Sequence, residues 1–355
     1  MTRRNDETLE RYAIRRAWEL GHFWGPDNPA GRMVTQESLS KLTIDDPEVV
    51  AALISLSKMH ATSYTESSLR AYGDSPHFDG KLDVPMADIL DEPRCLVPDF
   101  APPPGIKFTF ADPMIQRVAE RMQQNAAEAV GSGGWKGCHG VGDFHCAIGR
   151  VDDTYLPSFL KPVFLQVIRN VQTAYAEVGL LWRHVDRTGK DLLNGEDLSG
   201  KTVNTEISFV TSSSGWIGLA ILGQNETCSS TIWAKFLATY KGGSTAEAVA
   251  QQWTTLWLHE LGHNCSLDHT NGGVMNPSLV NGLPGKWTPS DPSTSKLRKL
   301  FGGVPVPIPG GNPPGPPEDP GQIDEKRIRD IEVTNAVQSA TIAWCVAEIK
   351  KLKEA

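Results

Sequence analysis

The most informative stretch of this chain reads HELGHNCSLDH and covers residues 259–269. His259 and His263 are four residues apart, so on an α-helix both imidazoles project from one face and can bind the same metal ion. His269 follows after a turn that must reverse the chain, and it is the candidate third ligand. Three protein ligands with an open fourth position are typical of a catalytic zinc. The stretch therefore predicts a helix that ends in a zinc site.

Glu260 follows the first histidine and would stand beside the metal. A carboxylate there can take a proton from a zinc-bound water, whose pKa the metal lowers to about 7, and later pass it to a leaving amine. This is the chemistry of peptide hydrolysis. The competing explanation is a chance match to His-Glu-x-x-His, which the added His269 makes rare. Cys265 is expected to pack as a small apolar side chain rather than to bind the metal.

Residues 259–269 resemble the zinc-binding signature of the metzincin metallopeptidases, and residues 267–270 are most similar to the matrixin branch, the matrix metalloproteinases. Met275, with Pro277 two positions later, resembles the methionine turn that metzincins place beneath the zinc. One departure is Ser266, where the family has glycine. Glycine permits a positive φ after the helix, whereas serine adopts it only at a steric cost. The loop that presents His269 is therefore expected to be strained.

A second match lies at residues 93–99, which read PRCLVPD and resemble the matrixin propeptide "cysteine switch", with Leu96 in place of the usual glycine. The resemblance implies that the Cys95 thiolate binds the zinc, displaces the water needed for hydrolysis and keeps the enzyme latent. It also implies an ion pair between Arg94 and Asp99 that brackets the cysteine. The alternative is a free buried cysteine near two prolines.

The expected fold class is α+β, with a metzincin catalytic domain built from a twisted mixed sheet and long helices around a zinc cleft. The domain boundaries expected from the sequence are a helical prodomain ending in the switch (1–99), a connector (100–134), the catalytic domain (135–303), a Pro/Gly-rich linker (304–322) and a C-terminal helix (323–355). Helical matrixin prodomains are similar to peptidoglycan-binding folds, so binding to a cell wall is an alternative role for the N-terminal domain.

Hydrophobic periodicity and turn residues predict the individual elements. The N-terminal half is predicted to contain helices at residues 8–20, 46–60, 86–90 and 112–130. The catalytic domain is predicted to follow with strands at 146–151, 180–185, 204–210, 215–222 and 231–240, and with helices at 156–178, 245–264 and 289–301. The strand at 215–222 is the expected edge strand, on which metzincins align an extended substrate by backbone hydrogen bonds.

The number of metal ions follows from what the sequence contains near residue 210. No His-x-Asp element occurs between residues 210 and 215, so we expect one catalytic zinc and leave calcium open. Cys138 and Cys146 bracket His139 and His145. These four residues could form a second metal cluster, a short disulfide loop or free thiols, and the sequence does not decide among the three.

Charge and hydropathy limit the partners. The net charge of −8 argues against a protein that binds the phosphate backbone of nucleic acids. No stretch of apolar residues is long enough for a membrane span. The family resemblance implies a secreted, extracellular enzyme, although the first residues lack the apolar core of a signal peptide. Residues 323–352 show a heptad seam, which predicts a homo-oligomer through this helix, while Val333, Val337 and Trp344 form a competing face that could dock on the catalytic domain.

The function predicted from these patterns is that of a latent zinc-dependent endopeptidase acting on protein or peptide substrates. His259, His263 and His269 hold the zinc, Glu260 is general base and acid, Cys95 inhibits, and Met275 supports the site from below. Two alternatives remain: a homologue that binds zinc without turnover, and a protein that binds cell walls through residues 1–92.

Overall fold

The structure is a computed structural model of the chain. It describes residues 6–60, 90, 94–95, 97–110, 116–120, 122–123, 139–141, 144–156, 161–210, 218–220, 228–233, 246–270, 272–277 and 285–309. The helix predicted at 86–90, most of the one at 112–130, the linker beyond residue 309 and the C-terminal helix with its oligomer seam lie outside the described residues.

The N-terminal helices form where the sequence predicts them. Helix α1 spans Leu9–Glu19, after an N-cap at Thr8 whose hydroxyl accepts from the Arg11 amide, and α3 spans Pro47–His60. Between them lie the short helix α2 (Gln36–Leu39) and two 3₁₀ turns, η1 (His22–Trp24) and η2 (Gly31–Met33). Their apolar side chains share one core with Leu90, Cys95, Val97 and Phe110. We call the described residues 6–123 the N-terminal unit.

The described residues between 139 and 309 form a second unit, the sheet unit, around a six-stranded mixed sheet. A path of paired strands runs in the order β1-β2-β4-β6-β5. Strand β3 lies off this path and pairs with β2. The pairs β2–β3, β2–β4 and β4–β6 are parallel, whereas β1 and β5 are antiparallel to their neighbours. The strands are β1 (His139–Val141), β2 (Phe144–Asp152), β3 (Leu180–Val185), β4 (Thr205–Val210), β5 (Gly218–Ala220) and β6 (Cys228–Trp233).

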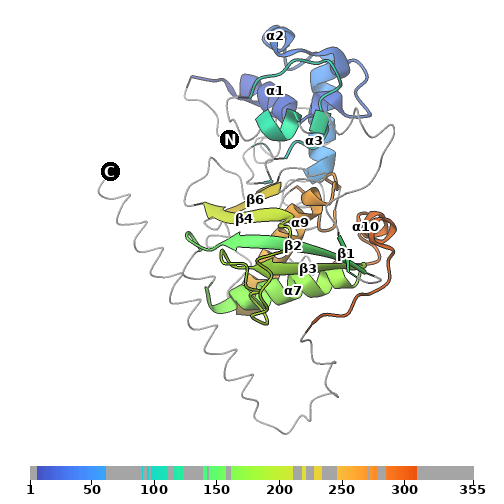
Figure 1. The fold of residues 1–355 in the computed structure, drawn as a ribbon. Helices are drawn as coiled ribbons and strands as arrows, with labels where there is room; N and C mark the ends of the chain where they lie inside the picture. The colour runs from blue at the N-terminus through green and yellow to red at the C-terminus, as the bar shows by residue number, and fades with distance from the viewer. Residues whose placement is uncertain are drawn as a thin grey trace, which may run out of the picture.

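One face of this sheet is covered by two helices, α7 (Phe164–Ala176) and α9 (Ala246–Asn264). Alternation along β3 sends Leu180 and Trp182 into the core that these helices complete. The N-terminal helices lie beyond the end of the sheet that carries β6 (Figure 1). The architecture is thus mixed α and β, compatible with the predicted α+β class, and β5 stands at the sheet edge as predicted.

Two helices begin later than the periodicity predicts. Helix α7 begins at Phe164 rather than near residue 156, because residues 161–163, which include Pro162, form a 3₁₀ turn before it. Helix α10 spans Thr294–Phe301 rather than starting at residue 289. The residues before it form a loop in which Asp291 accepts a hydrogen bond from the Ser293 amide.

Strand β6 begins at Cys228, three residues before the predicted start at 231. Its register explains the difference, because Cys228 to Trp233 pair residue by residue with the whole of β4. The apolar pattern from residue 231 onward marks only the second half of this pairing. The strand predicted at 215–222 is described only over its central residues, Gly218–Ala220.

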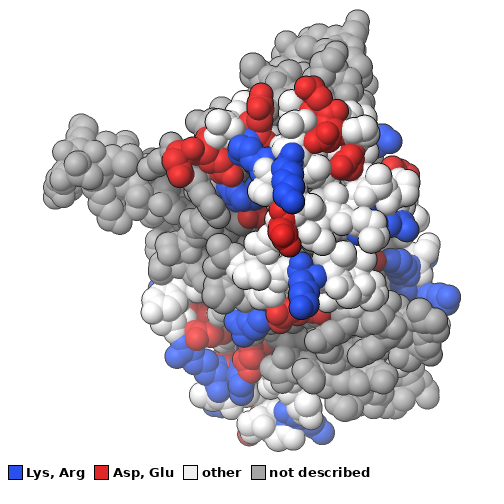
Figure 2. All heavy atoms as spheres, turned by 90° about the horizontal axis from the view of Figure 1, so that it is seen from above, with Lys and Arg blue, Asp and Glu red and all other residues white. Residues whose placement is uncertain are grey.

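Several smaller predictions can be compared with the structure. Cys146 carries a free thiol, and Cys138 lies outside the described residues. The predicted linker is packed at its start, because Val306 donates its amide to the Ala176 carbonyl and is buried beside Leu181. No helix in the described part of the chain is both long and apolar enough to cross a membrane. Seen from above, acidic and basic side chains are interspersed (Figure 2).

Candidate metal centre

The C-terminal end of α9 carries His259 and His263, and the turn after it directs the chain toward His269. The Leu267 amide donates to the Gly262 carbonyl at 3.0 Å, and the Ser266 amide to the His263 carbonyl at 2.9 Å. These are the two bonds of a Schellman motif, whose turn residue is left-handed. Ser266 occupies that position with φ 61°, and it is the one non-glycine residue with positive φ in the described part of the chain. The strain predicted before His269 is thus present.

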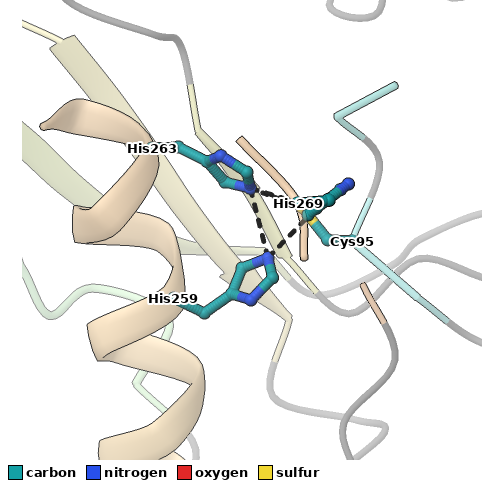
Figure 3. A group of neighbouring side chains, drawn as sticks. All are labelled: Cys95, His259, His263 and His269. Carbon is teal, nitrogen blue, oxygen red and sulfur yellow. Dashed lines mark hydrogen bonds between the residues drawn. The ribbon is translucent and has the colours of Figure 1, made fainter. Parts of the chain in front are cut away.

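The three predicted histidine ligands converge on one point, with their Nε2 atoms facing one another (Figure 3). His263 Nε2 lies 3.1 Å from His259 Nε2 and 3.1 Å from His269 Nε2, and the third pair is 3.3 Å apart. All three side chains are buried. Burial, together with the neighbouring imidazoles, lowers the pKa of His259 and His263 well below the usual value, and burial lowers the pKa of His269 to about 4. The imidazoles are therefore neutral.

The hydrogen-bond partners of the three Nδ1 atoms determine which nitrogen of each ring carries the proton. His259 Nδ1 is 2.8 Å from the Val274 carbonyl, and His263 Nδ1 is 2.8 Å from the Leu267 carbonyl. A carbonyl oxygen only accepts, so each Nδ1 carries the proton and each Nε2 presents a lone pair. His269 Nδ1 likewise faces a carboxylate, Asp99. Three lone pairs at this separation repel one another unless a cation lies between them, which is the arrangement of a metal site.

The spacing fits tetrahedral zinc. Zn–N bonds of about 2.0–2.1 Å at tetrahedral angles place two nitrogens about 3.3 Å apart, and a Zn–S bond of about 2.3 Å places sulfur about 3.6 Å from nitrogen. Cys95 Sγ lies 3.6 Å from His263 Nε2. The four donor atoms of Cys95, His259, His263 and His269 lie within 4.8 Å of one another, and this buried group could hold a metal ion.

Cys95 reaches the cluster on a segment that is tied to both units. Its side chain belongs to the core of the N-terminal unit, while its amide donates to the Pro277 carbonyl at 2.9 Å. Burial, followed by the charge of Glu260, raises the pKa of the Cys95 thiol well above its usual range. A bound cation has the opposite effect, because metal coordination deprotonates a thiol.

Glu260 stands beside the donors without being one of them. It is 0% exposed, Oε2 lies 4.0 Å from Cys95 Sγ, and Oε1 has no hydrogen-bond partner among the described residues. Burial raises the pKa of this carboxyl well above its usual range. On β5, Gly218 lies so close that a Cβ there would collide with the Glu260 carboxylate. The carboxylate is therefore held between the cluster and the edge strand.

Met275 lies in a tight turn beneath the helix end, as the resemblance predicts. It is fully buried, and its sulfur occupies the space where a Cβ on Gly262 would stand. The turn is fixed by the Thr270 amide, which donates to the Met275 carbonyl at 3.0 Å, and by Asp291, whose carboxylate accepts from the Val274 amide at 2.6 Å. Val274 in turn orients His259. Asp291 thus supports the site from the loop before α10.

Asp99 has a larger role than its predicted ion pair. The pair with Arg94 is present and buried. In addition, Asp99 Oδ1 lies 2.6 Å from His269 Nδ1, and Oδ2 lies 2.6 Å from His22 Nε2. Burial alone would raise the pKa of Asp99, but Arg94 and the two histidines lower it well below its usual range. The carboxylate therefore stays ionised at the junction of the two units.

No protein-family model matches this chain, and no curated protein matches it. The resemblance to the matrixins therefore stays a prediction from the sequence motifs. The structure brings together every predicted site residue: the four donors, Glu260 and Met275. Sequence reasoning missed His22, Asp291 and Gly218, each of which acts through a contact distant in the chain. Only Asp291 carries a local signal, because Asp-Pro favours a turn.

Proposed function

We propose that this chain is a latent zinc-dependent endopeptidase that hydrolyses peptide bonds in proteins or peptides. One observation carries the proposal: three histidine lone pairs and a cysteine sulfur surround one point, and next to them stands a buried carboxylate oxygen that has no hydrogen-bond partner among the described residues. A structural zinc site would need four permanent ligands and no such carboxylate. The residues instead match a catalytic centre whose fourth position is blocked by a removable ligand.

Zinc bound by the three histidines would supply Lewis acidity to a water molecule and to the substrate carbonyl. Glu260 is then the group that moves the proton. Its raised pKa, caused by burial, lets the carboxylate take a proton from water and hold it until the leaving amine accepts it. Gly218 keeps Glu260 close to the edge strand β5, where an extended peptide can add to the sheet by backbone hydrogen bonds.

Cys95 keeps this centre latent. Its sulfur is the fourth donor of the cluster, and its segment belongs to the core of the N-terminal unit. Removal or displacement of the N-terminal unit would therefore open the fourth position. Among the described residues, these four donors are the one group that could hold a metal ion.

The test compares the full chain with three variants on a broad peptide library, with and without a thiol-modifying mercurial. Cys95→Ser should cleave peptides without the mercurial, whereas the wild type should need it. The matched control is Cys146→Ser, another free thiol outside the cluster, which should stay latent. In the Cys95→Ser background, Glu260→Gln should lower hydrolysis by about 10²–10⁴-fold while zinc is retained.

The proposal is wrong if Cys95→Ser gains no activity and Glu260→Gln loses none. A Cys95→Ser protein that holds one zinc per chain but cleaves nothing would identify a zinc-binding homologue without turnover. Affinity for peptidoglycan that resides in the N-terminal residues, without hydrolysis, would favour the cell-wall alternative.

A further inference from the structure

The N-terminal unit contacts the metal cluster at a second ligand besides Cys95. Asp99, 3% exposed, lies 2.6 Å from His269 Nδ1 through its Oδ1. The same carboxylate is paired with Arg94 and with His22, and its own amide donates to the Leu20 carbonyl at 2.8 Å. Three of these four contacts lie within the N-terminal unit. Asp99 therefore links the N-terminal unit to the third metal ligand.

His22 is itself held in one orientation. Its Nδ1 lies 3.0 Å from the Ser55 hydroxyl on α3, and its ring packs edge-on against Phe100 at 5.5 Å. Because the ionised Asp99 only accepts, His22 Nε2 carries the proton, and Nδ1 accepts from the Ser55 hydroxyl. A continuous series of contacts thus runs from α3 through Ser55, His22 and Asp99 to His269.

The other two histidines are oriented differently. His259 and His263 donate to backbone carbonyls of the sheet unit, whereas His269 donates to a carboxylate of the N-terminal unit. A carboxylate partner fixes the ring and raises the basicity of the ligating nitrogen, and losing such a partner typically costs about 10–100-fold in metal affinity. His269 also lies in the loop after the left-handed Ser266, outside the helix that carries the other two histidines.

We propose that Asp99, positioned by His22, holds His269 in its ligating orientation, so that the N-terminal unit strengthens the metal site at the same time as Cys95 blocks it. This inference rests on the proposed function only in taking the cluster as a zinc site. Release of the N-terminal unit then removes both Cys95 and Asp99. The released sheet unit should therefore bind zinc more weakly than the latent chain does.

The experiment measures zinc affinity of the full chain by competition with a chromogenic chelator. All variants carry Cys95→Ser, so that the thiolate makes no contribution. Adding Asp99→Asn should weaken zinc binding about 10-fold or more. The matched control is Glu7→Gln, which removes one carboxylate charge from the ion pair with Arg15 in the same unit, and it should leave zinc affinity unchanged. Equal affinity with and without Asp99→Asn would overturn the inference.

The part played by His22 is tested by a double-mutant cycle. His22→Leu should weaken zinc binding when Asp99 is present and have no further effect when Asp99 is already Asn. A purely structural role predicts the same loss in both backgrounds, which would contradict a positioning role. Because His22 is buried, two milder variants accompany it: His22→Gln, which keeps a donor for Asp99 and should retain affinity, and Ser55→Ala, which should lower it slightly.

The readout separates this inference from the proposed function. A chain whose zinc affinity follows Asp99 but which never hydrolyses peptides contradicts the proposed function alone. A chain that hydrolyses peptides after activation but whose zinc affinity ignores Asp99 and His22 contradicts this inference alone.

Discussion

The two sides of the metal cluster are built in different ways. On the helix side, His259 and His263 are one turn apart on α9, and backbone carbonyls of the same unit orient both rings. On the loop side, His269 follows a left-handed serine and is oriented by Asp99, 170 positions away in the sequence. The helix side is thus complete within its own unit, whereas the loop side depends on the N-terminal unit.

The difference teaches where this site can be regulated. A helix fixes its ligands by local hydrogen bonds that persist when a partner leaves. A loop ligand relies on long-range contacts, so the loss of a partner changes its position and its basicity. Four changes to the chain sharpen or break this comparison, and we give them from the largest expected effect to the smallest.

The largest effect is expected from His263→Ala. His263 Nε2 is close to each of the other three donors, so its loss should weaken zinc binding by more than about 100-fold, beyond what loss of an orienting partner costs. Chelator competition measures this. His184→Phe, which changes a buried histidine outside the cluster, should keep zinc. Wild-type affinity in His263→Ala would show that the helix side is not the metal site.

The free energy of unfolding should depend on pH through His184, which packs beneath the helix side. His184 on β3 is buried against Trp257 of α9, and neither of its ring nitrogens has a partner among the described residues. Burial lowers the pKa of His184 to about 4. Between pH 6.5 and 4 the unfolded chain therefore binds a proton that the folded chain excludes, and stability falls as the pH falls, by about 3 kcal/mol in total.

This contribution of His184 is complete above about pH 6.5 and lost near pH 4. Urea unfolding of zinc-free protein at pH 7 and pH 4.5 measures it, and His184→Phe should show a smaller loss over the same interval. The same pH dependence in both proteins would exclude His184 as the cause.

A smaller effect is expected from Gly262→Ala on the helix side. The added Cβ would collide with Met275 Sδ, and overpacking of a core typically costs about 1–3 kcal/mol. Alanine regains about 1 kcal/mol of helix propensity, so a net loss on the order of 1 kcal/mol should remain in the free energy of unfolding. Gly200→Ala, where a Cβ has open space, is the control. A higher free energy of unfolding in Gly262→Ala would show that the Met275 side chain can move away from the added Cβ without loss of stability.

Ser266→Gly on the loop side is expected to raise the free energy of unfolding. A non-glycine residue in the left-handed region costs about 1–2 kcal/mol, and the Ser266 hydroxyl is buried without a partner among the described residues. Glycine loses more backbone entropy on folding, so a net gain below about 1 kcal/mol should remain. Ser40→Gly, at a right-handed position, should not stabilise. A loss of stability in Ser266→Gly would mean that Ser266 is not strained.

The sequence predicted helices and strands best where the hydrophobic pattern within one element marks its bounds. Helices α1, α3 and α9 and strands β3 and β4 lie within one or two residues of their predicted bounds, because amphipathic periodicity and caps act over a few residues. The predicted starts of α7, α10 and β6 were wrong. Pro162 lies in a 3₁₀ turn before α7, side-chain contacts of Asp291 fixed the loop before α10, and pairing with β4 fixed the start of β6.

By itself the sequence determined the donors of this site: the spacing of His259 and His263, the turn toward His269 and the cysteine at position 95. The histidine spacing is a local property, because a helix of 3.6 residues per turn fixes which side chains share a face, whereas Cys95 was assigned through its resemblance to the cysteine switch. Only the tertiary structure decided which groups orient and confine them. Asp99, His22 and Gly218 reach the site from distant segments, and no local pattern records a contact that forms only when the two units pack together.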